Sequence, residues 1–185
     1  MNSMPLEGEI WEAILTGATA ADAHRLAARC VEAPKCLEVV AQAARELEGD
    51  KRALAFAVMK KVAETEPALL EPFREVLLDL DHPGDPWTVP LLAAQAAALV
   101  SWLPSWHQRL RDAFEPRLDD PNKFVKAWAL RVLGRIAEPG SDLHETLMKI
   151  CDRFLGEGGA LAASARIVRG ASRRATQKWA NEASN

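Results

Sequence analysis

Histidines and the acidic residues beside them are the side chains of this sequence best suited to chemistry. His144 and Glu145 begin the segment HETLM, which lacks the second histidine that a zinc-binding HExxH helix requires. His82 lies in the segment DHPGDP with Asp81 and Asp85, three side chains that could bind an ion but are common in an exposed turn. Neither segment therefore predicts a catalytic or metal site.

Other reactive or phosphate-binding patterns are equally weak. The cysteines, Cys30, Cys36 and Cys151, have no CxxC or Cys/His ligand spacing, and we expect each to fill space on its helix. Residues 156–159 are rich in glycine, but no strand precedes them and no Lys-Ser or Lys-Thr pair follows. The sequence contains no GxSxG or Rossmann fingerprint. It predicts no cofactor and no metal, and it does not identify an enzyme.

One strongly amphipathic helix is predicted within residues 119–138. At 100° per residue its apolar side chains share one arc, which we expect to be buried. That arc comprises Phe124, Val125, Trp128, Ala129, Val132, Leu133 and Ile136. The opposite arc comprises Lys123, Arg131, Gly134 and Glu138. Asp119 and Asp120 are suited to cap the start of this helix, and Pro139 is suited to end it.

The same pattern occurs earlier in the chain. Residues 126–138, KAWALRVLGRIAE, align with residues 52–64, RALAFAVMKKVAE, at an offset of 74 positions. Two repeats of about 37 residues would fit the range of helical-hairpin families. A weaker middle copy, PLLAAQAAALVSWL, spans residues 90–103. The alignment predicts a helical repeat.

About ten helices are predicted in total, and no segment alternates with period two. The predicted helices span residues 6–15, 20–33, 36–47, 51–65, 67–80, 87–103, 105–118, 121–138 and 142–155, with a last one to about residue 179. Thr19 should cap the second helix, while Asp142 and Glu145 resemble capping residues at the start of the ninth. The fold class predicted is all-α.

The segment from Asp120 to Ile136 resembles the second helix of a HEAT repeat. It reads D-P-x-x-x-V-K-x-x-A-x-x-x-L-G-x-I. This resemblance to armadillo-type helical repeats implies a right-handed α-α superhelix, an α-solenoid of about five helical hairpins. It also implies a single domain over residues 1–185, with short flexible ends near residues 1–4 and 181–185.

The resemblance implies a structural ladder as well. In such repeats an acidic residue before the second helix and a basic residue near its start pair between neighbouring units. Asp120 and Lys126 match these positions, as do Glu46 and Arg52 in the earlier copy. The middle copy lacks the pair, because Leu92 occupies the place of the basic residue.

Composition limits the class of protein. Hydrophobic residues make up 49% and charged residues 26%, which excludes a disordered chain. No apolar run approaches the roughly 20 residues that a membrane span needs, and the start of the chain is acidic. We therefore expect a cytoplasmic protein. Residues 1–103 carry a net charge of −7 from nine basic and sixteen acidic residues, and residues 104–185 carry +4 from fourteen and ten.

Two surfaces are candidates for binding a partner. Phe124, Trp128, Arg131 and Arg135 form a row on the helix of residues 121–138, and aromatic and arginine side chains are enriched at binding hot spots. Alternatively, Trp128 is core and the arginines cover its ring.

The last helix carries the second surface. Its basic stripe, Arg166, Arg169 and Arg173, could meet phosphates or simply face solvent. Its apolar stripe should cover the preceding hairpin as a terminal cap. This apolar stripe comprises Leu161, Ala165, Val168, Ala175 and Trp179.

The function predicted is a non-catalytic scaffold or adaptor that binds a protein or peptide on its concave face, as a monomer or weak homodimer. One alternative is a purely structural subunit whose exposed end repeat packs against a copy of itself. Another is nucleic-acid binding by the more basic C-terminal half. Bacterial DNA-alkylation-repair glycosylases are similar to HEAT solenoids and bring tryptophans and an aspartate to DNA. Trp102, Trp106 and Trp128, with Asp119 and Asp120, are the residues here that the resemblance would assign to that role.

Overall fold

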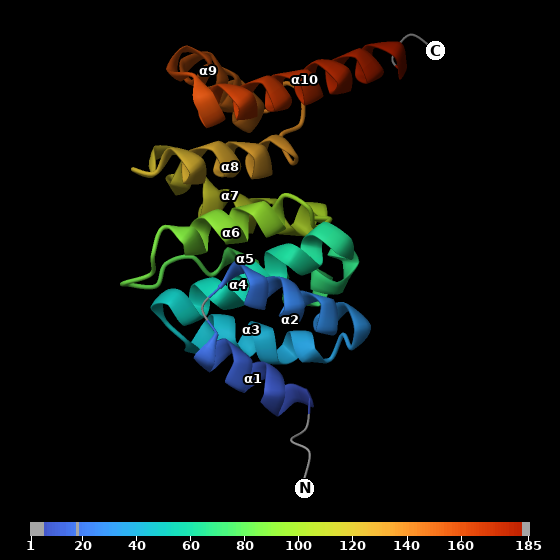
Figure 1. The fold of residues 1–185 in the computed structure, drawn as a ribbon. Coiled ribbons are helices and arrows are strands. Elements are labelled where there is room, and N and C mark those ends of the chain that lie inside the picture. Colours follow the sequence, from blue (N-terminus) through green and yellow to red (C-terminus); the bar gives the residue numbers. More distant parts are fainter. Residues whose placement is uncertain (1–5, 18, 183–185) are drawn as a thin grey trace, which may run out of the picture. The chain divides into compact units, whose positions relative to one another are not determined.

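The computed structural model describes residues 6–17 and 19–182, apart from the side chains of residues 179, 180 and 182 (Figure 1). These residues form ten α-helices and three short 3₁₀ helices, and no strand occurs among them. The prediction of an all-α protein is therefore confirmed. Contacts between Cα atoms divide the chain into two compact units, Met1–Ser101 and Trp102–Asn185.

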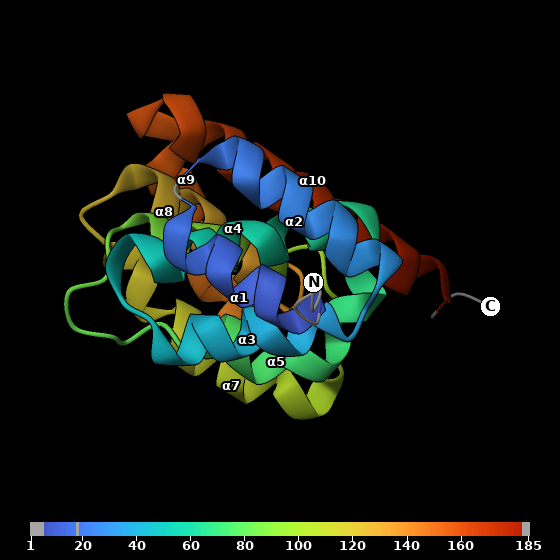
Figure 2. The same cartoon turned by 60° about the horizontal axis from the view of Figure 1, so that its bottom comes forward.

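The first unit is built around its longest helix, α4. Its elements are α1 (Leu6–Thr16), α2 (Ala20–Glu32), α3 (Cys36–Glu46), α4 (Gly49–Thr65), η1 (Pro67–Phe73), α5 (Arg74–Leu78) and α6 (Thr88–Ala97). α4 packs against α2, α3 and α6, and α1 lies against α3 (Figure 2). Phe56, Val58 and Met59 of α4 are fully buried at the centre of this unit.

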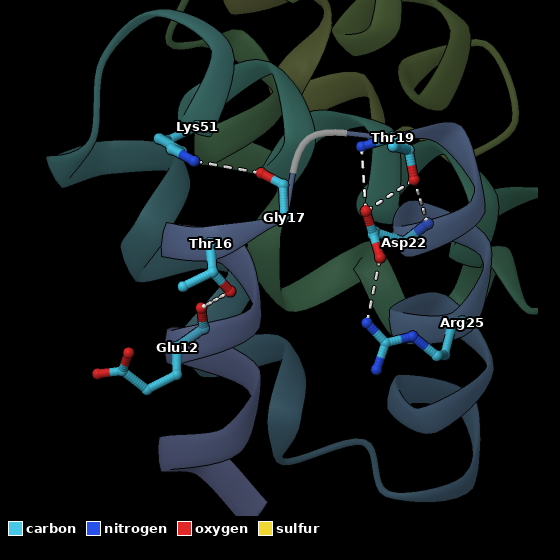
Figure 3. Close-up of polar contacts among 7 residues, drawn as sticks. All are labelled: Glu12, Thr16, Gly17, Thr19, Asp22, Arg25 and Lys51. Atoms are coloured by element: carbon cyan, nitrogen blue, oxygen red, sulfur yellow. Dashed lines mark hydrogen bonds and ion pairs between the residues drawn. The ribbon is translucent and has the colours of Figure 1, made fainter.

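A reciprocal cap starts α2 (Figure 3). The N–H of Asp22 donates to Thr19 Oγ1 at 3.2 Å, and the N–H of Thr19 donates to Asp22 Oδ2 at 3.1 Å. Arg25 pairs with the other oxygen of Asp22 at 3.2 Å. Lys51 of α4 donates to the Gly17 carbonyl at 3.2 Å, which ties the chain after α1 to α4. The prediction that Thr19 caps the second helix is confirmed.

The second unit is built around α8 and α10. Its elements are η2 (Pro104–Trp106), α7 (His107–Phe114), η3 (Pro116–Asp119), α8 (Lys123–Gly134), α9 (Asp142–Glu157) and α10 (Gly159–Glu182). α10 packs along both α8 and α9, and α8 packs against α7 and η3. Of the ends expected to be flexible, residues 181 and 182 continue α10, while residues 1–4 and 183–185 lie outside the described part of the chain.

Prolines break two of the predicted helices. The helix predicted over residues 67–80 is a 3₁₀ helix followed by the five residues of α5, with Pro72 inside the 3₁₀ part. The helix predicted over residues 105–118 is interrupted just before Pro116. Proline has no N–H to donate and its ring crowds the preceding turn, so it disrupts a regular α-helix at these points.

A third predicted helix also ends early. The segment predicted to be helical over residues 87–103 leaves the α conformation after Ala97. Leu103 is extended, with ψ of 153°, and it precedes Pro104. A residue before proline is disfavoured in the α region, so Pro104 accounts for the extended Leu103 but not for the end of α6 at Ala97.

The starts of α8 and α9 differ from prediction. Asn122, and not Asp119 or Asp120, caps α8, since its Oδ1 accepts the N–H of Phe124 at 2.9 Å. Asp120 lies in the turn before the helix. Its Oδ1 accepts the N–H of Asn122 at 2.8 Å and stabilises that turn. At α9 the cap is Ser141, which replaces the predicted Asp142 as the acceptor.

The buried surface of α8 is wider than the apolar arc predicted for it. Val125, Ala129, Val132, Leu133 and Ile136 are buried as expected. Phe124, however, is 43% exposed, and Gly134 was wrongly placed on the polar side. A Cβ at Gly134 would lie 2.8 Å from both methyl groups of Val168 on α10. The close packing of α10 explains why α8 is also buried beyond its main apolar arc.

Candidate partner-binding surface

Most sides of α8 are covered, and the predicted row, which ends at Arg135 just after the helix, is part of what remains at the surface. Phe124 and Arg135 are exposed, while Trp128 and Arg131 are half-buried. Their spacing of four, three and four residues places them on one side of the helix. The structure therefore brings together all four side chains of this row.

Arg131 has a structural role within this row, the exposed strip of α8. Its guanidinium carbon lies 4.4 Å from the centroid of the Trp128 ring, and its Nε donates to the buried Ser164 Oγ of α10 at 2.9 Å. Burial lowers the pKa of Arg131. Arg131 therefore contacts both the Trp128 ring and α10. These contacts hold the Trp128 and Arg131 side chains in place between the more exposed Phe124 and Arg135.

The three arginines of the basic stripe predicted on α10 differ in their surroundings. Arg166 and Arg173 are exposed, whereas Arg169 pairs with Asp152 of α9 at 2.7 Å. The ion pair fixes the side of α10 that faces α9.

The apolar stripe predicted on α10 faces its neighbouring helices. Leu161, Ala165 and Val168 are buried and Ala175 is half-buried, while the side chain of Trp179 lies outside the described part.

Basic and acidic residues of the second unit are distributed unevenly among its helices. α8 contains three basic residues and no acidic one, and α10 contains five basic residues and one acidic one. The rest of residues 104–185 contains six basic and nine acidic residues. The net positive charge of this half therefore resides on α8 and α10, which lie side by side.

A buried charge cluster lies in the first unit. Arg52 of α4 is fully buried, with its Nη1 3.3 Å from Asp85 Oδ2 and its Nη2 donating to the Asp79 carbonyl. The Asp85 side chain is only 6% exposed. Burial raises the pKa of Asp85, and the charge of Arg52 opposes that effect. His82 contacts Asp79 at 3.0 Å in the same loop. The cluster fastens the loop before α6 to α4.

The predicted ladder residues have other contacts. Glu46 accepts a hydrogen bond from Gln42 at 3.0 Å, and Asp120 accepts one from the backbone. Lys126 is half-buried on α8. Arg52 pairs with Asp85 of the loop before α6, at 3.3 Å.

Asp85 is the residue that sequence reasoning missed. It was assigned to an exposed turn with His82, although the Asp85-Pro86 pair repeats Asp120-Pro121 at an offset of 35 residues. That offset is close to the repeat length expected from the rest of the chain. Aligning the two Asp-Pro pairs would have set Asp85 level with Asp120 and singled it out from the other residues of the turn.

His144 and Ser172 form a close polar pair between α9 and α10. The Gly140 N–H donates to His144 Nδ1 at 3.3 Å, which fits the tautomer that carries its proton on Nε2. Nε2 then carries the proton and donates to Ser172 Oγ, 2.6 Å away. A serine nucleophile needs the reverse arrangement, in which the imidazole accepts the hydroxyl proton. In this state the pair links two helices and does not activate Ser172.

The other candidates for chemistry also make structural contacts. Cys30, Cys36 and Cys151 are buried, and burial raises the pKa of Cys30 to about 12 and that of Cys151 to about 11. Among the residues that the structure describes, no group of three or more His, Cys, Asp or Glu is arranged to hold a metal ion.

Residues assigned to a DNA-repair role by resemblance are only partly assembled. Trp102 and Trp106 pack edge to face, with ring centroids 6.0 Å apart, and Arg109 covers the Trp106 ring at 4.7 Å. Asp119 lies 3.6 Å from Arg153 of α9. Trp128 is covered on one face by Arg131.

Comparisons with known proteins leave the family open. No family model, no curated protein and no solved structure matches the chain. Within the described ranges, no helix is both long enough and apolar enough to cross a membrane.

Proposed function

We propose that the chain is a HEAT-like α-solenoid that acts as a non-catalytic scaffold and binds a protein or peptide partner on the side formed by the second helices of its hairpins. Packing within each unit supports the repeat. In the first unit α2, α4 and α6 pack in series, and α1 packs on α3. In the second, α10 packs beside α8. Stacking of each helix on the one two places later is the pattern of helical-hairpin repeats.

The exposed strip of α8 carries the functional part of the proposal. Phe124 and Arg135 are exposed at its two ends, and the Trp128–Arg131 stack between them is held by Ser164. A rigid base limits the side-chain entropy lost on binding, and aromatic and arginine side chains dominate binding energy in many interfaces. These properties suit a protein or peptide ligand.

Substitution at the two exposed ends of the strip tests this function. We expect Phe124→Ser with Arg135→Glu to reduce capture of a partner from a nuclease-treated lysate of the source organism by about tenfold or more, because both ends of the strip are removed. Trp128 is kept, since its loss would also disturb the contact with α10. Helical circular dichroism should be unchanged.

Lys149→Glu is the matched control, because Lys149 is exposed on α9 and the substitution makes the same change of charge. Equal capture by the wild type and the double variant would contradict the proposed site. Loss of capture on nuclease treatment of the wild type would point to a nucleic acid instead.

A further inference from the structure

We infer that the partner segment is an acidic peptide with a large apolar side chain, bound along a strip formed by α8 and α10. This inference rests on the proposed function and specifies the chemistry of its ligand. The α8–α10 strip is defined by Phe124, Arg135, Ile167, Arg174 and Lys178. Each is at least partly open to solvent, and Ile167 is 51% exposed.

The direction of the two helices places these residues on one side. Arg131 of α8 contacts Ser164 of α10, and Gly134 lies against Val168, so α8 and α10 run in the same direction. The side of α10 that faces α8 therefore includes Ser164 and Val168. At 100° per residue, Ile167, Arg174 and Lys178 fall next to that side.

Arg166 and Arg173 lie on the other side of α10. They flank Arg169, whose ion pair with Asp152 marks the side facing α9. At 100° per residue they are separated from the row of Ile167 and Arg174 by roughly a quarter of a turn or more. The basic residues of α10 thus form two separate rows, and one of them continues the exposed strip of α8.

A hollow adjoins the strip at Arg135. It has a volume of about 270 Å³ and lies where residues 134–137, α9 and α10 meet, with Leu147, Met148 and Val168 among its apolar lining residues. The hollow can take a large apolar side chain. Carboxylates on the same peptide would then be close to Arg135 and the cations farther along α10.

The distances fit a short segment. Gly134 is level with Val168, so Phe124 and Lys178 lie about 30 Å apart along the helices at 1.5 Å per residue. An extended peptide of about nine residues spans this length. The charged residues of the strip, Arg135, Arg174 and Lys178, are all basic, so the peptide segment should be acidic.

The same surface is poorly suited to single-stranded nucleic acid. Bases bind mainly by stacking on open aromatic faces. Arg131 lies over the Trp128 ring at 4.4 Å, and Lys123 lies over the Phe124 ring at 5.4 Å. An exposed isoleucine and an apolar hollow offer no contact to phosphates, whereas both match an apolar peptide side chain.

Fluorescence anisotropy with defined probes tests the inference on the full chain. The main probe is a labelled peptide of about ten residues. In one half of it leucine alternates with serine, and the other half is all glutamate. The peptide is made with the glutamate half at the C-terminus and, separately, at the N-terminus. Comparison probes replace glutamate by lysine or leucine by serine, and a single-stranded oligothymidylate is the nucleic-acid probe. We expect the acidic leucine peptide, in one direction, to bind at least about tenfold more tightly than every comparison probe.

Two variants and a control locate the site. Arg174→Glu with Lys178→Glu should weaken peptide binding by about tenfold or more, and Ala171→Phe, which fills the hollow, should weaken it similarly. Arg166→Glu with Arg173→Glu makes the same change of charge on the other row and should alter binding by less than about threefold at 0.15 M salt. Circular dichroism must show that each variant remains folded.

Tighter binding of oligothymidylate than of the peptide would overturn the inference, as would an equal effect of the two charge variants. Failure of the peptide to bind would also overturn it. If capture from the lysate still depended on Phe124 and Arg135 in that case, the scaffold function would stand and only the partner chemistry would be wrong. If that dependence were absent too, the proposed function would fail with it.

Discussion

Replacing Arg52 by methionine is expected to destabilise the protein by about 3–5 kcal/mol at pH 7. Arg52 is fully buried, and it is the cation closest to the nearly buried carboxylate of Asp85. Methionine would fill much of the space but leave that carboxylate without its countercharge. The measurement is urea unfolding followed by circular dichroism, with the midpoint and slope determined for each variant.

A second substitution separates charge from packing. Arg52→Met combined with Asp85→Asn should recover part of the lost stability, because no buried charge is then left unpaired. If the double variant were no more stable than Arg52→Met, the loss would come from packing or from the broken bond to the Asp79 carbonyl.

The effect of Arg52→Met should also depend on pH. Burial already raises the pKa of Asp85, and loss of the Arg52 charge should raise it further. A carboxyl whose pKa is higher in the folded state takes up its proton there first, so its destabilising effect shrinks as the pH falls toward the unfolded pKa of about 3.9. The stability gap between wild type and Arg52→Met should therefore be smaller at about pH 4.5 than at pH 7. A gap that stayed constant would show that Asp85 is not its source.

Gly134→Val is expected to destabilise the protein by about 1–3 kcal/mol. Even one carbon added at Gly134 would lie 2.8 Å from both methyl groups of Val168, so α8 and α10 would have to move apart. The small gain in helix propensity over glycine would offset part of this loss. Chemical unfolding of the single variant gives the size of the effect.

Val168→Ala tests the direct contact. It removes the two methyl groups that collide, so Gly134→Val with Val168→Ala should be more stable than the sum of the two single effects predicts. Simple additivity would mean that the strain arises elsewhere.

Local features of the chain were predictable from sequence because they depend on neighbouring residues. The cap at Thr19, the apolar periodicity of α8 and the row from Phe124 to Arg135 follow from spacing alone. The exact caps of α8 and α9 did not follow, since several polar residues near each helix start could accept the same backbone N–H. Asn122 and Ser141 were selected by turn geometry that the pattern does not contain.

Long-range features were not predictable in the same way. Gly134 has no side chain to signal burial, and its place depends on how closely α10 approaches. Asp85 looked like a loop residue because its partner, Arg52, is 33 positions away. Whether Trp128 was core or surface stayed open for a similar reason, because the answer depends on Arg131 and on Ser164 of α10.

Site-specific photocrosslinking in cells of the source organism tests the central claim most directly. A benzophenone amino acid placed at Phe124, on the exposed strip of α8, should give a discrete light-dependent crosslink to a protein. The same amino acid at Lys149, exposed on α9, is the control within the same unit. The account predicts a crosslinked protein from position 124 that is absent from position 149. No crosslinked protein from position 124, or the same products from both positions, would contradict it.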